Sequence, residues 1–204
     1  MWSPGQEGGT ATANLLLGKA DPTGKLPITF PVDSSHTPFA GHPERARPTN
    51  GTIVWSEGLQ MGYRWYLANR VKPQFPFGFG LSYSSFRYDR LKVSGPHGRS
   101  GAVTVSFRVR NDGRVTGAEV PQVYLSLPTS AGEPSRRLVG FQRVTLRPGG
   151  ATTIRVVLDP ASTDRPLSVW DTARHSWRTV TGRFTVLVGA SVTDRRLSGS
   201  FVVR

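Results

Sequence analysis

The sequence predicts a mainly β protein, in which an immunoglobulin-like β-sandwich over residues 84–204 follows an incomplete α/β segment over residues 1–83. Apolar and polar residues alternate from about Phe86 onward, which is the period of strands with one buried face. About seven short strands follow at regular spacing with turn residues between them, a pattern typical of a sandwich. The first part differs, because it opens on a glycine-rich loop and a short helical pattern.

A strand is missing in front of that first loop. Residues 4–9, PGQEGG, should receive a buried strand and lead into a helix. A buried strand needs roughly five apolar residues, and only Met1 and Trp2 precede the loop. We therefore expect the preceding element, and with it the catalytic chemistry, to lie upstream of this chain.

The other elements of the first part are short. Residues 8–17 predict a helix that Gly18 ends. The four residues 21–24, DPTG, have the residue types of a β-turn. The segments that follow are an extended edge segment at 26–31, a polar loop at 32–52, an amphipathic segment at 57–66 and a packed aromatic–glycine loop at 75–83.

Strands account for most of the second part. Residues 102–110 alternate without a break, and Asn111-Asp112-Gly113 then turns the chain. Trp170 and Trp177 flank a hairpin-like connection, and we expect them to close one end of the sandwich core. Further strands are predicted at residues 120–127, 138–146, 153–158, 184–188 and 197–203.

Composition excludes several classes of protein. Apolar residues make up 37% of the chain, which is enough for a core and argues against disorder. The chain has no cysteine, so a disulfide framework and a thiolate metal site are excluded. No apolar run approaches the roughly 18 residues of a membrane span. No signal peptide is visible at the N-terminus, so the cytoplasm is the default compartment.

The net charge of +13 is concentrated in the second part. Residues 1–83 hold seven Lys/Arg against five Asp/Glu, whereas residues 84–204 hold nineteen against eight, a net charge of +11. The arginines are spread along strands, and the only doublets are Arg136-Arg137 and Arg195-Arg196. Nucleic-acid binders concentrate charge on one helix or stripe, so this distribution favours a solvated surface and no nucleic-acid partner.

Seven segments in order resemble the C-terminal third of the family 3 glycoside hydrolases, the β-glucosidase and β-xylosidase family. They are PGQEGG with its helix, DPTGKLPITFP, EGLQMGYRWY, FPFGFGLSYSSF, VRNDGRVTGAEVPQVYL, LVGFQRVTLRPGG, and VLVGAS with DRRL. The resemblance implies that residues 1–83 are the tail of an α/β sandwich domain and that residues 84–204 are a fibronectin type III-like domain. It also implies that the family's aspartate nucleophile and glutamate acid/base lie upstream of PGQEGG, so neither has a counterpart here.

No catalytic, cofactor-binding or metal-binding residue is predicted. Glu7 at the helix start is expected to bond backbone amides, and Glu57 is expected to be a structural cap. Neither has a placed carboxylate partner for acid/base work. Gly8-Gly9 lacks the following Lys-Ser/Thr of a phosphate loop.

The histidines and aromatic residues are also interpreted structurally. The four histidines lie in loops or turns without metal-ligand spacing and are expected to be solvated: His36, His42, His97 and His175. Four aromatic residues are compatible with a sugar platform: Trp55, Tyr63, Trp65 and Tyr66. Packing against the sheet of the full-length family member is favoured for them, and some of their surface is expected to be exposed where that sheet is absent.

We interpret the chain as a non-catalytic, architectural C-terminal part of a family 3 glycoside hydrolase, from a truncated, split or partially predicted gene. One alternative is a subunit that completes a separately encoded catalytic chain. Another is a free-standing module that binds wall polysaccharide or an acidic polymer. Self-association, or association with the missing N-terminal catalytic part, is also expected, because eight apolar residues should pack on elements absent from the chain: Leu15, Leu16, Leu17, Ile28, Phe30, Trp65, Phe75 and Phe77.

Overall fold

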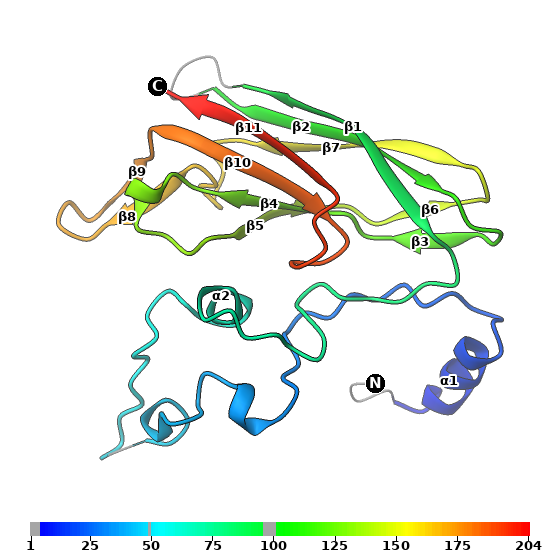
Figure 1. Cartoon of the computed structure of the whole chain (residues 1–204), viewed down its shortest axis with the longest axis horizontal. Helices are drawn as coiled ribbons and strands as arrows, with labels where there is room; N and C mark the ends of the chain where they lie inside the picture. Colours follow the sequence, from blue (N-terminus) through cyan, green and yellow to red (C-terminus); the bar gives the residue numbers. More distant parts are fainter. Residues whose placement is uncertain (1–4, 49, 96–100) are drawn as a thin grey trace.

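The computed structural model describes residues 5–48, 50–95 and 101–204 (Figure 1). His97 and the expected lead-in of Met1 and Trp2 lie outside these residues. The strands from Phe86 onward form a two-layered sandwich, and the first part lies along one side of it. The protein is therefore mainly β, as predicted.

The first layer is an antiparallel sheet in the order β1-β2-β7, formed by β1 (Phe86–Ser94), β2 (Val103–Asn111) and β7 (Ala151–Leu158). Every second residue of β2 is fully buried, from Val103 to Asn111. This pattern confirms the alternation that predicted the strand, because successive side chains of a strand point to opposite faces.

The second layer is a sheet in the order β11-β10-β4-β5. Its strands are β4 (Gln122–Ser126), β5 (Arg137–Phe141), β10 (Gly182–Gly189) and β11 (Leu197–Val203). The rings of Phe184 and Phe201 stack at 5.1 Å between centroids within one core that both layers share. Burial of these apolar faces is the main stabilising term of the sandwich.

Two small sheets flank the layers. They pair β3 (Gly117–Glu119) with β6 (Val144–Leu146) and β8 (Ser168–Asp171) with β9 (Ser176–Thr179). A 3₁₀ turn at Thr129–Ala131 precedes β5. The described residues thus hold eleven strands rather than about seven.

Two predictions about the sandwich are wrong. Residues 138–146 are two strands, because the chain leaves β4 after Phe141 and pairs with β3 instead. Trp170 and Trp177 do flank a hairpin, but each is 48% exposed, so they do not close the core. Their rings pack edge to face on one another, with centroids 5.6 Å apart.

The first part contains two helices and two 3₁₀ turns. α1 (Gly8–Leu16) ends before Gly18, which has φ +69°, as predicted. The 3₁₀ turns are Ser34–His36 and Pro43–Arg45. Of the expected amphipathic segment 57–66, only the end is helical, in α2 (Tyr63–Ala68), because Gly62 has φ +55° and the helix begins after it.

The extended edge segment pairs with the aromatic–glycine loop. Phe30 forms a β-bridge with Phe75, and the Leu26 and Gly78 amides complete backbone hydrogen bonds between the two segments. The expected turn at residues 21–24 is absent, since this stretch runs without a turn along the sandwich. Asp21, its first residue, bonds distant backbone amides instead.

Candidate functional site at the junction of the two parts

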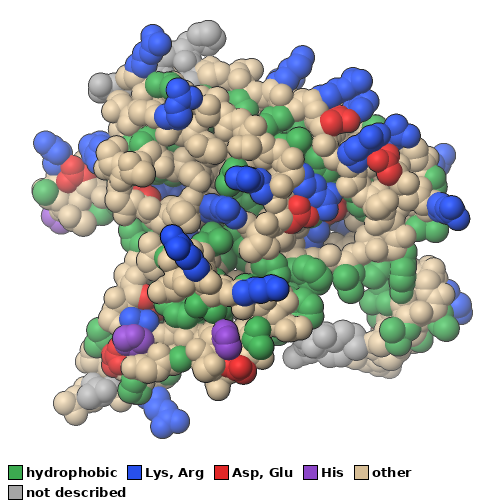
Figure 2. All heavy atoms as spheres, viewed as in Figure 1, with side chains coloured by type: hydrophobic (Ala, Val, Ile, Leu, Met, Phe, Trp, Pro, Cys, Tyr) green, Lys and Arg blue, Asp and Glu red, His purple; other side chains and the backbone are tan. Residues whose placement is uncertain are grey.

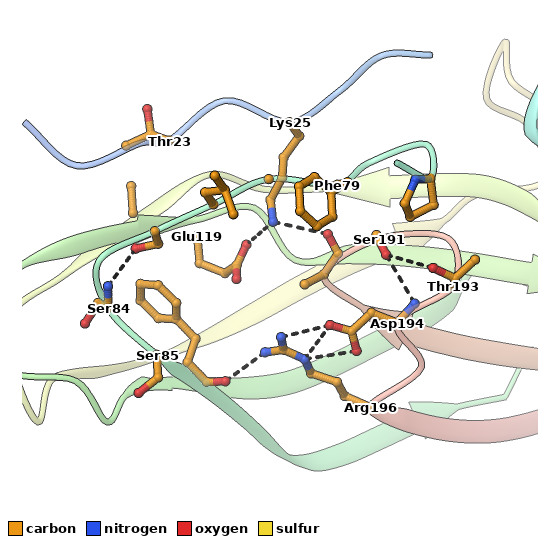
Figure 3. A pocket seen from close by; sticks show the side chains of 17 residues that line it. Thr23, Lys25, Phe79, Ser84, Ser85, Glu119, Ser191, Thr193, Asp194 and Arg196 are labelled. Atoms are coloured by element: carbon orange, nitrogen blue, oxygen red, sulfur yellow. Dashed lines mark hydrogen bonds and ion pairs between the residues drawn. The ribbon is translucent and has the colours of Figure 1, made fainter. Parts of the chain in front are cut away.

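A lysine from the first part inserts its side chain between the two parts (Figure 3). Lys25 Nζ lies 2.8 Å from Glu119 Oε1 and donates a hydrogen bond of 3.1 Å to the Ala190 carbonyl. The two side chains are only 16% and 8% exposed. A charge buried to this extent requires its partner, so the ion pair fixes segment 21–27 on β3.

A single carboxylate makes the second connection. Asp21 accepts hydrogen bonds from the Tyr83 amide at 2.7 Å, from the Ala118 amide at 3.1 Å and from Ser82 Oγ at 3.0 Å. Hydrogen bonds to a charged acceptor are the stronger class. Asp21 therefore joins three chain segments that are far apart in the sequence.

The third connection is apolar and aromatic. Tyr63 of α2 stacks on Phe77 with centroids 4.7 Å apart and meets Tyr124 of β4 edge to face at 6.2 Å. Its hydroxyl accepts a hydrogen bond from the Leu138 amide at 3.1 Å. Phe77 thus packs on the sandwich, which corrects the expectation that it requires an element outside the chain.

Gln122 of β4 completes the junction. Its Nε2 donates to the carbonyls of Gly78 at 3.0 Å and of Ala190 at 2.9 Å. Gly78 has φ +80°, and a Cβ there would overlap the Gln122 amide. Only glycine fits both the backbone angle and this close approach.

A cavity of about 590 Å³ lies beside the ion pair. Segment 23–25, residues 76–86, β3 and the β10–β11 connection line it, and Figure 3 shows Lys25 and Glu119 across it from Asp194 and Arg196. The Arg196 guanidinium pairs with Asp194 at 2.9 Å, donates to the Phe86 carbonyl at 2.7 Å and lies 4.5 Å from the centre of the Tyr88 ring.

The carboxylates considered from the sequence lie elsewhere. Glu7 precedes Gly8 and Gly9 at the start of α1 but is exposed and makes no capping hydrogen bond, so its expected role is wrong. Glu57 is not a cap either, because α2 begins six residues later. Its side chain is 4% exposed, and Oε2 lies 3.4 Å from Arg45 Nε.

A neighbouring carboxylate does not complete an acid/base pair with Glu57. Glu44 Oε1 lies 3.9 Å from the same Arg45 nitrogen and contacts His42 Nδ1 at 3.1 Å. A hydrogen bond from its own backbone amide, followed by its contacts with His42 and Ser56, lowers the pKa of Glu44. A general acid requires a raised pKa, so this group is poorly suited to that role.

His36 contacts a serine and an aspartate without forming a catalytic triad. Its Nδ1 lies 3.1 Å from Ser35 Oγ and 2.8 Å from Asp33 Oδ1. A triad uses the two ring nitrogens separately, one for each partner, whereas here one nitrogen makes both contacts. Asp33 also accepts the Ser35 amide and so caps the 3₁₀ turn.

The described residues contain no group of three or more His, Asp or Glu side chains that could hold a metal ion. His42 is paired with Glu44, and His175 lies exposed in the β8–β9 hairpin with φ +49°.

The four candidate platform aromatics do not act as one surface. Tyr66 is buried at 7% exposure, Trp65 packs against it edge to face, and Tyr63 packs on the sandwich. Trp55 is 56% exposed. Tyr63 therefore packs on the sandwich and Tyr66 is buried, whereas Trp55 leaves aromatic surface exposed, as expected where a packing partner is absent.

The sequence did not single out Lys25 or Glu119. Each lies in a segment quoted for the resemblance, but their pairing joins residues from opposite parts of the chain. A local signal exists only for Glu119, an acidic residue that follows Gly117 and Ala118 in a buried strand.

Charge on the sandwich is scattered. Figure 2 shows Lys and Arg side chains spread over the visible face, with Asp and Glu among them. None of the helices in the described part of the chain is long and apolar enough to cross a membrane.

Comparisons with known proteins match both parts. Residues 1–83 match the glycosyl hydrolase family 3 C-terminal domain, and residues 119–192 match the fibronectin type III-like domain. A probable β-glucosidase L of Aspergillus terreus is 39% identical over 100% of this chain and 29% of its own length. Thermostable β-glucosidase B of Acetivibrio thermocellus is 36% identical over 93% of this chain and 24% of its own length.

Solved structures agree with these relatives. DesR, a β-glucosidase from Streptomyces venezuelae, is 38% identical with a TM-score of 0.91 and covers 100% of this chain and 26% of its own. A family 3 β-glucosidase of Bifidobacterium adolescentis is 32% identical with a TM-score of 0.88, over 97% of this chain and 28% of its own. The chain spans less than a third of these enzymes and corresponds to the C-terminal portion of the family 3 glycoside hydrolases.

Proposed function

We propose that this chain is an architectural, non-catalytic part of a β-glucosidase-type enzyme and does not hydrolyse glycosides by itself. The observation that carries the proposal is its match to only the C-terminal portion of enzymes named β-glucosidases. Its task is to hold the end of the α/β domain on a fibronectin-like sandwich, which then braces the remainder of the enzyme.

The junction supports this role. Three independent connections hold the first part on the sandwich: the Lys25–Glu119 ion pair, the Asp21 carboxylate and the Tyr63 ring. Each combines a buried or half-buried side chain with a partner fixed in the sandwich. Such contacts restrict the relative motion of two parts of a protein.

The carboxylates support the absence of catalysis. Retaining hydrolysis needs two carboxyl groups roughly 5–5.5 Å apart on either side of the glycosidic bond, one of them with a raised pKa. Glu57 is buried against Arg45, and Glu44 beside it has a lowered pKa.

A second candidate function is that of a subunit that completes a separately encoded catalytic chain. Exposed apolar side chains of the first part favour it, because Leu16, Leu17 and Ile28 are 78%, 70% and 48% exposed. Covering such side chains stabilises an assembly by about 1.5–3 kcal/mol for each one fully buried.

Aryl β-glucoside hydrolysis tests both candidates. The purified chain alone is expected to give no rate above a blank, whereas a mixture with the upstream portion of a family 3 enzyme gains activity if the chain acts as a subunit. Leu16→Glu should abolish that gain, and Lys19→Glu, a nearby exposed change, serves as the matched control. Hydrolysis by the chain alone that is lost in Glu7→Gln or Glu57→Gln would contradict the proposal.

A further inference from the structure

We propose that Arg136 and Arg195 form a binding site for a doubly charged oxyanion of the phosphate class. This inference concerns a new site and does not depend on the architectural role. The two arginines belong to the two arginine doublets of the sequence, one at residues 136–137 and the other at residues 195–196. The fold brings these doublets together, and one arginine of each is left without an acidic partner.

The second arginine of each doublet is neutralised by a carboxylate. Arg137 pairs with Glu133 and Arg196 pairs with Asp194, each at 2.9 Å. The first arginine of each doublet forms no ion pair with a described residue, and no carboxylate is among the electrostatic neighbours of Arg136. Two positive charges therefore remain without a counter-charge.

A hydrogen bond between distant segments places the two free arginines near each other. Arg136, which directly precedes β5, donates from Nη1 to the carbonyl of Val192 in the β10–β11 connection. Arg195 follows Val192 in the same connection, three residues further along. Burial, followed by the positive charge of Arg195, lowers the pKa of Arg136, and a nearby like charge has this effect on a cation. An anion bound by both arginines would replace their repulsion by two attractions.

Arg136 is held in place before any anion binds. It is half-buried, and Val192, whose carbonyl it contacts, is 4% exposed and donates its own amide to the Phe77 carbonyl at 3.0 Å. Tyr124, which is 2% exposed, is the other electrostatic neighbour of Arg136. A guanidinium that is already fixed loses less side-chain entropy when a ligand binds.

The unused donors and the charge of the two guanidinium groups match a phosphate. A guanidinium has five N–H donors in a planar fork. Among the described residues, the Arg136 side chain donates only to Val192, and the Arg195 side chain donates to none. Hydrogen bonds from arginine to phosphate are charge-assisted and frequently bidentate. A phosphate group carries about −1.5 to −2 at pH 7, so it balances both guanidinium charges, whereas a carboxylate balances only one.

Titration of the ¹⁵N-labelled full chain with inorganic phosphate tests the site, at an ionic strength kept constant with chloride. We expect saturable shifts of the Arg136 Nε–H resonance and of the Val192 and Thr193 amides, with millimolar affinity. Acetate should bind about tenfold more weakly, because it carries one charge. Either the lack of a saturable shift with phosphate or equally tight binding of acetate would overturn the proposal.

Methyl phosphate identifies the source of the anion, because it carries the same group on an organic substituent. Affinity equal to that of inorganic phosphate, or weaker, would assign the site to the free anion. Tighter binding of methyl phosphate would assign it to a phosphate ester. Both results support a site of the phosphate class.

Two variants locate the anion, and a third is the matched control. Arg195→Gln removes one charge at an exposed position and should weaken phosphate binding about tenfold, the effect of one lost charge-assisted contact. Arg136→Lys keeps the charge but removes the planar fork, and it should weaken binding about fivefold while the melting temperature is maintained. Arg155→Gln changes the net charge as Arg195→Gln does, but at an exposed position of β7 in the other layer, and it should leave the affinity within about twofold.

Two outcomes of the variant series would overturn the proposal. Weakening by Arg155→Gln equal to that by Arg195→Gln would mean that phosphate follows only the net positive charge of the chain. Binding that neither Arg136→Lys nor Arg195→Gln changes would place the anion elsewhere.

Discussion

Replacing Lys25 by methionine should weaken the docking of the first part of the chain while the sandwich stays folded. The change keeps most of the apolar stem but removes the charge that Glu119 contacts at 2.8 Å and the hydrogen bond to the Ala190 carbonyl. Breaking a buried ion pair from one side destabilises by roughly 3–5 kcal/mol, because the other charge stays buried without a partner.

The structure argues for a loss at or just below the lower end of that range. Glu119 retains the hydrogen bond from the Val120 amide at 2.7 Å, and the cavity beside it can admit water. We therefore expect a loss of about 2–3 kcal/mol in the free energy of docking, which corresponds to about 30- to 150-fold in an equilibrium constant.

Amide hydrogen exchange measures this loss locally. The amides of Leu26 and Gly78 form hydrogen bonds within the first part, so their exchange should accelerate by that factor when the segment opens. The amides of Val105 and Phe107 in β2 should not change, because their exchange requires opening of the sandwich. Lys19→Met, which removes the charge of an exposed lysine, is the control.

Two results would refute this reasoning. One is exchange at Leu26 and Gly78 within about threefold of the original chain, which would assign the ion pair less than 1 kcal/mol. The other is equal acceleration in β2, which would mean that the two parts unfold together. Adding Glu119→Gln to Lys25→Met should recover part of the loss, because it removes the uncompensated buried charge.

The remaining predictions concern titration and independent folding. A hydrogen bond from Ser35 Oγ, followed by one from His36, lowers the pKa of Asp33 from 3.8 to about 2; a carboxyl with a depressed pKa contributes stability above its unfolded value that is lost as pH falls through the folded value. The 3₁₀ turn at Ser34–His36 should therefore be stable above about pH 4 and loosen towards pH 2. In an NMR titration of Ser35→Ala, the midpoint of the Asp33 carboxyl should move nearer to 3.8. An unchanged midpoint would contradict the assignment. Residues 84–204 expressed alone should fold as a monomer, because their core is formed within the sandwich, whereas the intact chain should self-associate through Leu16, Leu17 and Ile28. Light scattering at low and high salt distinguishes the cases, since apolar association persists when salt screens the net positive charge, and a monodisperse intact chain at high micromolar concentration would refute the second claim.

The strands could be predicted because apolar and polar residues alternate along the sequence in step with the buried and exposed positions of a strand. β2 shows this directly, since each apolar residue from Val103 to Val109 lies in the core. Segment 138–146 was predicted as one strand because no glycine or proline turn separates Phe141 from Val144. The break there depends on which strand lies alongside, and local sequence does not contain that information.

The junction could not be predicted in the same way. The residues of DPTGKLP are typical of a turn, yet Asp21 and Lys25 have their partners in β3 and at Ala190, which follows β10. Propensity favours the turn, and the tertiary hydrogen bonds of the Asp21 carboxylate override it. The prediction that Trp170 and Trp177 close the core failed for a related reason. Large aromatic side chains can bury part of their surface against one another outside the core, as these two rings do.

The partners of Lys25 and Asp21 also determine when this junction can form during synthesis. The Ala118 amide, which donates a hydrogen bond to Asp21, lies 97 residues further along the chain than Asp21. The Ala190 carbonyl, which accepts a hydrogen bond from Lys25, lies 165 residues further along than Lys25. A ribosome builds the chain from the N-terminal end, so the first part leaves the exit tunnel long before either partner exists. During that interval the apolar side chains of the first part have no sandwich to pack against. The nascent chain is thus most dependent on chaperones before β10 emerges, and a ribosome that stalls there leaves a product whose first part cannot dock.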